Sequence, residues 1–242
     1  MLKTLSNGLK DLIYPPHCLS CSIPLKHHTP QKKLCQPCHD SIEFNHPPFC
    51  PKCSRYLGPL SERVRCKPCS ANNPDFNFAW GACIYNKHLR NLLHIFKYQQ
   101  KTSLRHVFAQ SMINFIQRHN FDIAQFDIII PIPLSWARKR ERGYNQAGLL
   151  ANPISKTFNI PISHKILKRN RYTESQTHLS QKERWTNITD AFTIKNSSDV
   201  KGKNILLIDD LLTTGATTSE AARTLKHSGA QTVGLLTLAI TV

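Results

Sequence analysis

The sequence predicts an α/β domain with a mostly parallel sheet and flanking helices, preceded by a small cysteine-rich module. Apolar segments of strand length at 126–132, 205–208 and 232–240 alternate with helical patterns, which is the order expected of a parallel sheet. Eight of the nine cysteines, in contrast, lie before residue 70. We therefore divide the chain into a module at 1–80 and a larger domain at 81–242.

The eight early cysteines form four Cys-x-x-Cys pairs, which predict two zinc sites. The pairs are Cys18/Cys21, Cys35/Cys38, Cys50/Cys53 and Cys66/Cys69. Two thiolates on one tight turn can bind one tetrahedral ion, and a second pair closes the site. Four thiolates leave no open position for water, so both Zn²⁺ ions are expected to be structural. Either the quartets follow chain order, as two stacked ribbons, or they interleave, and the sequence leaves both arrangements open.

A helical connector at 86–119 joins the module to a core at 120–242. Leucine and phenylalanine recur there at helical spacing in two runs separated by a short polar stretch, which predicts two amphipathic helices that cover the sheet. Lys97, near the end of the first run, is expected to be a surface lysine. Cys83 lies outside the four pairs and is expected to be an ordinary buried thiol.

A polar loop follows the apolar segment 205–208 and precedes a helix that begins near Ala216. Two carboxylates can accept hydrogen bonds from the vicinal hydroxyls of a ribose, while threonine hydroxyls and the N–H groups of a helix N-terminus favour a phosphate. The loop therefore predicts a ribose-phosphate site. Its expected contacts are Asp209, Asp210, Thr213, Thr214, Gly215, Ala216 and Thr217.

The protein is basic, with 32 Lys and Arg against 15 Asp and Glu and a formal net charge of +17. Residues 138–184 alone hold 11 basic and 3 acidic side chains. A solvated face and an anion channel for phosphates or a nucleic-acid strand both agree with this balance. No apolar run approaches the roughly 18 residues that indicate a membrane span, and the polar start is unlike a signal peptide. We expect a cytoplasmic protein without membrane insertion.

Taken together, these motifs resemble type I phosphoribosyltransferases, and over nearly its full length the chain resembles the ComF family of competence-associated phosphoribosyltransferase-like proteins. The resemblance is carried by the cysteine pairs, by residues 96–98, 130–134 and 142–146, by several polar positions between 169 and 187, and by the loop at 209–217. It implies a type I phosphoribosyltransferase fold that binds phosphoribosyl pyrophosphate with Mg²⁺.

The resemblance also implies where the pyrophosphate lies. The loop after the first core strand, at 131–142, would line it, with Arg142 as first choice and Arg138 as second, because cations offset the charge of a leaving pyrophosphate. Lys139 and Arg140 are expected to be solvated. The polar stretch 170–187 would correspond to a mobile loop that closes over substrate. Its candidate contacts are Arg171, Thr173, Gln176 and Arg184.

The function that follows is a magnesium-dependent phosphoribosyltransferase-like protein of DNA uptake and natural transformation, with an acceptor and catalytic residues that the sequence does not identify. Two alternatives remain. The chain is a non-catalytic phosphoribosyl pyrophosphate sensor that uses its basic face to bind single-stranded DNA, or it is a zinc-ribbon adaptor that recruits a helicase-like protein of the competence machinery.

Overall fold

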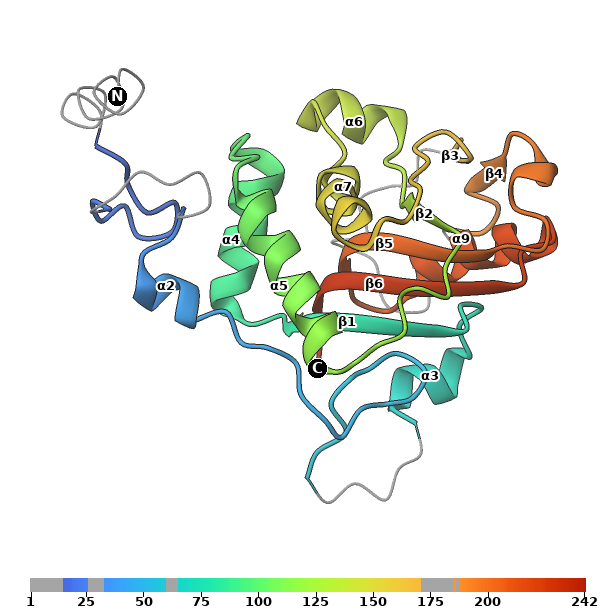
Figure 1. Ribbon diagram of the computed structural model, residues 1–242, viewed down its shortest axis with the longest axis horizontal. Coiled ribbons are helices and arrows are strands. Elements are labelled where there is room, and N and C mark those ends of the chain that lie inside the picture. Colours follow the sequence, from blue (N-terminus) through green and yellow to red (C-terminus); the bar gives the residue numbers. More distant parts are fainter. Residues whose placement is uncertain (1–14, 26–32, 60–64, 171–184, 186–187) are drawn as a thin grey trace.

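A four-stranded parallel sheet forms the centre of the protein in the computed structural model, which describes residues 15–25, 33–59, 65–170, 185 and 188–242 (Figure 1). The strand order is β1-β6-β5-β2. The strands are β1 (Phe78–Ile84), β2 (Ile128–Pro131), β5 (Asn204–Leu212) and β6 (Thr232–Ile240). The last three confirm the predicted apolar segments. The sequence does not predict β1, which spans residue 80. The division of the chain at that residue stays a prediction.

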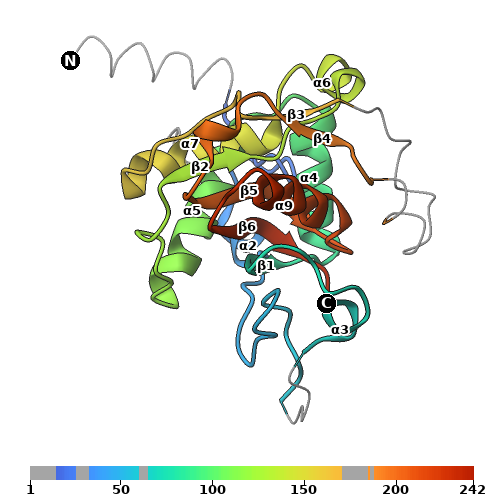
Figure 2. The same cartoon turned by 90° about the vertical axis from the view of Figure 1, so that its right-hand side faces the viewer.

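Alternate residues of each strand pack into two separate hydrophobic clusters, because successive side chains of a strand point to opposite faces. Leu206 and Ile208 of β5 share one cluster with the helices α4 (Lys87–Tyr98), α5 (Leu104–Arg118) and α7 (Gln146–Phe158). Ile205 and Leu207 share the other with α9 (Ala216–His227). The two helices predicted at 86–119 are therefore confirmed and cover the face of the sheet opposite α9 (Figure 2).

The segment expected to be a loop at 131–142 contains a helix, α6 (Trp136–Arg142). Ser135 precedes α6 in an extended conformation, and Gly143 ends it in the left-handed region at φ 78°. That conformation favours glycine and is common just after a helix. The loop prediction is thus wrong for Trp136–Arg142, where a run of good helix formers meets this stop signal.

Two short antiparallel strands lie above the sheet, β3 (Leu167–Arg169) and β4 (Phe192–Ile194). They flank the polar stretch whose residues 171–184 and 186–187 lie outside the described part of the chain. A short 3₁₀ helix, η1 (Ser197–Asp199), leads from β4 into β5.

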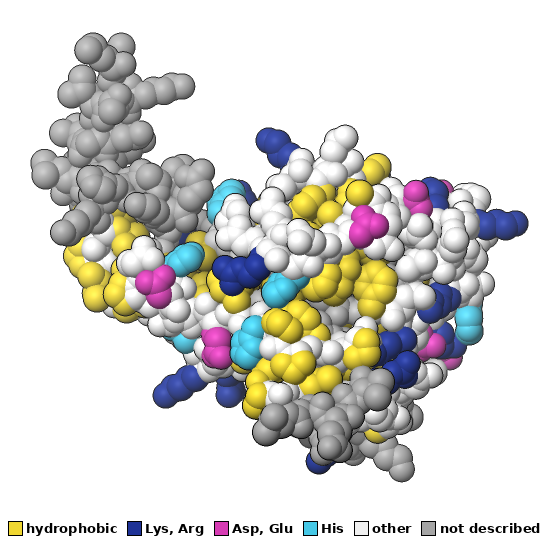
Figure 3. Space-filling model, turned by 60° about the horizontal axis from the view of Figure 1, so that its bottom comes forward, with side chains coloured by type: hydrophobic (Ala, Val, Ile, Leu, Met, Phe, Trp, Pro, Cys, Tyr) yellow, Lys and Arg dark blue, Asp and Glu magenta, His cyan; other side chains and the backbone are white. Residues whose placement is uncertain are grey.

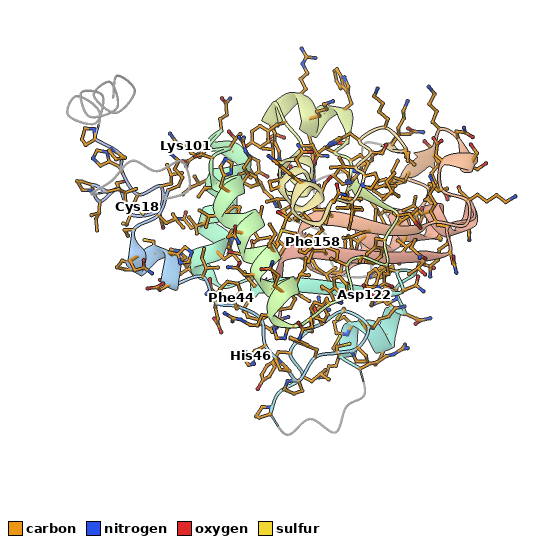
Figure 4. The ribbon with its side chains drawn as sticks, viewed as in Figure 1. Cys18, Phe44, His46, Lys101, Asp122 and Phe158 are labelled. Carbon is orange, nitrogen blue, oxygen red and sulfur yellow. The ribbon has the colours of Figure 1, made fainter. Side chains whose placement is uncertain are left out.

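The two cysteine quartets form in chain order, which settles the pairing that the sequence leaves open. The short helices α2 (Gln36–Asp40) and α3 (Lys67–Asn72) each start directly after a cysteine of a quartet. However, the ribbons are not stacked on each other. Cys18 belongs to the cluster of α4 and α5, the second quartet belongs to the cluster of α9, and Figure 4 shows Cys18 well apart from His46 near the second quartet.

The second ribbon also reaches the end of α5 through aromatic contacts. The ring of Phe49 lies 6.1 Å from that of Phe115 and 5.2 Å from that of His119. Hydrophobic and histidine side chains lie together on this side of the molecule (Figure 3). Each ribbon therefore buries its apolar side chains against the larger domain, since a module with so few apolar residues offers little core of its own. This explains why the quartets follow chain order without stacking on each other.

Within the described residues, none of the helices has the length and apolar character that crossing a membrane requires.

Candidate functional site

The two carboxylates of the predicted loop lie inside β5 and not after it, because β5 continues to Leu212. β6 pairs with β5 along this whole length, whereas β2 pairs with it only as far as Ile208. From Asp209 onward, one edge of β5 is thus left open. The prediction that this strand ends at Ile208 is wrong. The site lies beyond Ile208 because β2 no longer pairs with β5 there.

A cavity of about 780 Å³ lies at this open edge, above the carboxyl ends of the strands. All seven predicted loop residues line it. The remaining walls come from the β1–α4 connection, α4, the β2–α6 connection, α6, α7 and β3. They include Tyr85, Arg90, Leu93, His94, Lys97, Tyr98, Ile132, Pro133, Leu134, Ala137, Arg138, Glu141, Arg142, Gln146 and Arg169. Ligands of parallel α/β sheets bind in this position, so the geometry agrees with the predicted site.

Asp210 is held by two side chains from other elements. Lys97 of α4 forms an ion pair with its Oδ2 atom, and Gln146 of α7 donates a hydrogen bond to its Oδ1 atom at 3.2 Å. The Lys97 side chain is only 18% exposed. The expectation of a surface lysine is therefore wrong, because Lys97 lies on the face of α4 that meets the cavity and balances a buried carboxylate.

The neighbouring carboxylate, Asp209, forms no ion pair of its own with any described residue. Burial raises its pKa to about 8, and the adjacent Asp210 charge adds to this effect. Burial also acts on Asp210, but the charge and hydrogen bonds of Lys97 and Gln146 more than offset it and hold the pKa of Asp210 below its ordinary value. The pair is thus divided into an anchored carboxylate and one that can respond to a ligand.

Arg142 is buried at the end of α6, as a cation that lines the cavity. Its Nη2 atom donates a hydrogen bond to the Tyr98 hydroxyl at 3.0 Å, and its guanidinium lies 4.9 Å from the centre of that ring. Its Nε atom is buried and has no hydrogen-bond partner among the described residues, which leaves a donor for a ligand. Arg138 also lines the cavity and is half-buried, whereas Lys139 and Arg140 are exposed.

Gly215 makes the turn between β5 and α9 with φ 84°, a conformation that other residues rarely adopt. It is the N-cap residue of α9 and offers no side chain to the first N–H groups of the helix. The Thr214 hydroxyl accepts a bond from the Ala216 N–H at 3.4 Å. The first turn of α9 therefore presents N–H groups that favour a phosphate.

Each cysteine quartet has the geometry of a tetrahedral metal site. All nine cysteines are free thiols, and the four sulfur atoms of each quartet lie within 4.8 Å of one another. Sulfur atoms around one zinc ion are about 3.8 Å apart when each Zn–S bond is about 2.3 Å. The residues present thus fit zinc.

Comparison with known proteins assigns the chain to a family. Residues 144–240 match the phosphoribosyl transferase domain, and residues 9–70 match the double zinc ribbon domain. Competence protein ComFC of Bacillus subtilis is 31% identical over 206 residues, which cover 83% of this chain and 80% of that protein. The chain belongs to the ComF family.

Other relatives span nearly the whole ComF-family chain. Competence protein F of Haemophilus influenzae is 28% identical over 92% of this chain and 96% of that protein. The DNA utilization protein YhgH of Escherichia coli K12 is 26% identical over 83% of this chain and 93% of that protein. The sequence matches and the parallel sheet with helices on both faces confirm the predicted fold class.

Solved structures match about half of this ComF-family chain. An allosteric regulatory enzyme of purine biosynthesis has a TM-score of 0.35 and 20% identity, over 55% of this chain and 26% of that one. A purine phosphoribosyltransferase from Pyrococcus horikoshii has a TM-score of 0.33 and 18% identity, over 55% of this chain and 70% of that one.

Some side chains of the ComF-family cavity are not among the candidates that the sequence provides. Arg169 of β3 lines the cavity, and its guanidinium lies 5.6 Å from the Phe192 ring. Burial lowers its pKa to about 10. Lys97 and Gln146 also reach the site, and only their place within motifs of the family pointed to them. The predicted contacts Arg171, Thr173, Gln176 and Arg184 lie outside the described residues.

Proposed function

We propose that this ComF-family protein binds phosphoribosyl pyrophosphate together with Mg²⁺ in the cavity and acts as a phosphoribosyltransferase in DNA uptake. The observation that carries the proposal is the loop from Asp209 to Thr217, which joins two carboxylates to a helix N-terminus at the open edge of β5. Relatives named competence protein and DNA utilization protein support the cellular role.

Each part of the ligand has its own group of residues. Asp209 would accept hydrogen bonds from the ribose hydroxyls, and the 5′-phosphate would lie at the first turn of α9, near Thr214. Arg142, Arg138 and Arg169 would surround the pyrophosphate. Mg²⁺ bound to the diphosphate would neutralise part of its charge, and Asp209 is placed to hold the hydration shell of the ion.

Transfer would break the bond between the anomeric carbon and pyrophosphate, whose oxygen leaves with the electron pair, while a lone pair of the acceptor forms the new bond. The chain would contribute positioning and cations for the leaving group, without a covalent nucleophile. The cavity continues from Asp210 along α4 to Arg90 and Tyr85. This extra length leaves room for an acceptor and favours an enzyme over a sensor.

Pyrophosphate release tests the proposal. Wild-type protein incubated with phosphoribosyl pyrophosphate, Mg²⁺ and a panel of amine and heterocyclic acceptors should release pyrophosphate in an acceptor-dependent manner. Tight binding with no release for any acceptor would instead identify a sensor.

The raised pKa of Asp209 predicts a pH-dependent affinity. Because the pKa of Asp209 is about 8, the unliganded carboxyl carries a proton when the pH is below that value. This proton must leave before the carboxyl can hold a magnesium hydration shell. Affinity for the magnesium complex should therefore rise between about pH 7 and pH 9, by at most roughly tenfold per pH unit, and then level off. Calorimetry across this range measures it, and Asp209→Asn should remove the dependence. An affinity that stays flat or falls contradicts the assignment.

The exposed part of α6 favours single-stranded DNA as a second ligand. Trp136 is 71% exposed, and the Arg140 guanidinium lies 5.3 Å from the centre of its ring. Lys139 and Lys168 are also exposed. Aromatic rings among cations form the surfaces on which single strands stack. Tyr144, another ring of the basic stretch, does not belong to this surface, because its hydroxyl bonds the Phe96 carbonyl inside the protein.

Replacing Lys139 and Arg140 with Glu should weaken DNA binding and lower the slope of log affinity against log salt by roughly 0.7 per lost phosphate contact. Anisotropy titrations of a labelled oligonucleotide at several salt concentrations measure both effects. Lys87→Glu with Lys201→Glu makes the same change of charge at exposed positions on other elements and should leave the slope closer to wild type. Equal slopes for the two double variants would exclude α6 as the DNA surface.

A further inference from the structure

Arg55 of the second ribbon is buried, with 7% of its surface exposed, and bonds to three separate parts of the chain. Its Nε atom donates to the Thr241 carbonyl at 2.6 Å, and its Nη2 atom donates to the Thr213 carbonyl and to the Thr241 hydroxyl. Its Nη1 atom donates to the sulfur atoms of Cys53 and Cys66, at 3.8 and 3.9 Å. A guanidinium has five N–H donors, so every one has an acceptor.

The three parts that Arg55 joins are the second cysteine quartet, the ribose-phosphate loop and the end of β6. Thr213 lies in the loop between Asp210 and the first turn of α9. The Thr241 N–H donates in turn to the Leu212 carbonyl at 3.1 Å, which fixes the loop from its other side. Phe76, in the same hydrophobic cluster as the second quartet, packs beneath Gly215. The second ribbon thus supports the floor of the cavity.

Charge makes this contact sensitive to the metal. Among the described residues, no carboxylate forms an ion pair with Arg55, so the sulfur atoms of Cys53 and Cys66, which are thiolates when zinc is bound, are the groups from which its side chain would gain a counter-charge. One Zn²⁺ with four thiolates has a net charge of about −2, which balances a buried cation. Without the metal nothing would hold the four sulfur atoms at one ion, and the Nη1 atom of Arg55 would lose the fixed acceptors that Cys53 and Cys66 provide.

We propose that Arg55 is a positioning residue that couples metal occupancy of the second cysteine quartet to the shape of the ribose-phosphate loop. The metal-loaded quartet holds Arg55, and Arg55 holds the Thr213 carbonyl so that the neighbouring N–H groups face the phosphate. In the part of the chain that the structure describes, no hydrogen bond joins the first quartet to the ribose-phosphate loop, so we expect this coupling for the second quartet. The proposal rests on the proposed function in one respect: the affinity for phosphoribosyl pyrophosphate is used to report the shape of the loop.

Arg55→Met keeps a long side chain but removes all five donors. We expect it to retain two zinc ions, to bind magnesium phosphoribosyl pyrophosphate roughly tenfold or more weakly, and to exchange the amide hydrogens of residues 211–217 faster. Arg55→Lys keeps the charge with fewer donors and should fall between Arg55→Met and wild type. Arg65→Met removes an exposed arginine of the same ribbon, which bonds Asn73, and should match wild type.

Hydrogen exchange separates this coupling from the proposed function, because it needs no ligand. If wild type does not bind phosphoribosyl pyrophosphate, the proposed function fails, but faster loop exchange in Arg55→Met and after chelation of zinc from wild type still supports the coupling. If Arg55→Met does not fold, Arg55→Lys and the chelated wild type supply the same comparison. Loop exchange that stays at the wild-type rate in the folded variants and after chelation overturns it.

Discussion

Replacing Cys66 with Ser should remove one of two zinc ions and lower the free energy of unfolding by several kcal/mol. Metal binding supplies a large share of the folding free energy of small zinc modules, roughly 10 kcal/mol in isolated zinc fingers. Cys66 is buried in a hydrophobic cluster shared with Phe76 and Leu212, so its loss also disturbs the larger domain. Cys35→Ser should remove the other ion with a smaller effect, since Cys35 is half-buried in a more exposed quartet.

Elemental analysis and thermal unfolding of the purified variants measure both effects. Cys83→Ser provides the control, because Cys83 is buried outside both quartets and its pKa is raised to about 12 by burial alone. It should keep two zinc ions whatever its stability. Wild-type protein without zinc, or Cys66→Ser with two ions, would show that the quartets do not bind the metal.

Replacing both Asp209 and Asp210 with Asn should weaken binding of phosphoribosyl pyrophosphate by at least about 2 kcal/mol, through the loss of charge-assisted hydrogen bonds and of support for Mg²⁺. The structure separates the two contributions. Asp209→Asn removes the group expected to contact ribose, whereas Asp210→Asn leaves the Lys97 ammonium without its carboxylate. Lys97→Met combined with Asp210→Asn removes both charges and should recover part of the stability that Asp210→Asn loses.

Calorimetric titration measures these affinities, with thermal unfolding as a check that each variant is folded. Asp122→Asn makes the same chemical change at an exposed position that does not line the cavity, and should bind like wild type. Thr214→Val should weaken binding as well, because it places a methyl group where we propose that a hydroxyl faces the phosphate. Wild-type affinity in both the double Asn variant and Thr214→Val would place the ligand elsewhere.

Local patterns in the sequence predicted much of the site. Cys-x-x-Cys spacing identifies the four cysteine pairs, because two thiols on one turn reach one ion whatever the rest of the fold does, but it does not decide which pairs share an ion. Apolar strands β5 and β6 and the loop at 209–217 are likewise contiguous signals. Among four neighbouring cations the family resemblance favours Arg142, and Arg142 is the buried one.

Contacts between distant segments could not be predicted in this way. Lys97 and Asp210 are separated by most of the larger domain, and only the packing of α4 on the sheet brings them together. The contact between Arg55 and Thr213 is another such case, because nothing near Arg55 in the chain indicates that the fold brings the two residues together. The sequence also does not predict where each ribbon packs, because cysteine spacing describes the metal ligands and not the surface that each ribbon contacts.

Titration of phosphoribosyl pyrophosphate into the wild-type protein, with and without Mg²⁺, tests the central claim most directly. The account predicts saturable binding of one ligand per chain that depends on Mg²⁺ and is lost in the double Asn variant. Absence of binding up to about 1 mM, an affinity too weak to be specific for a ligand of this charge, or equal binding by the double Asn variant would contradict it.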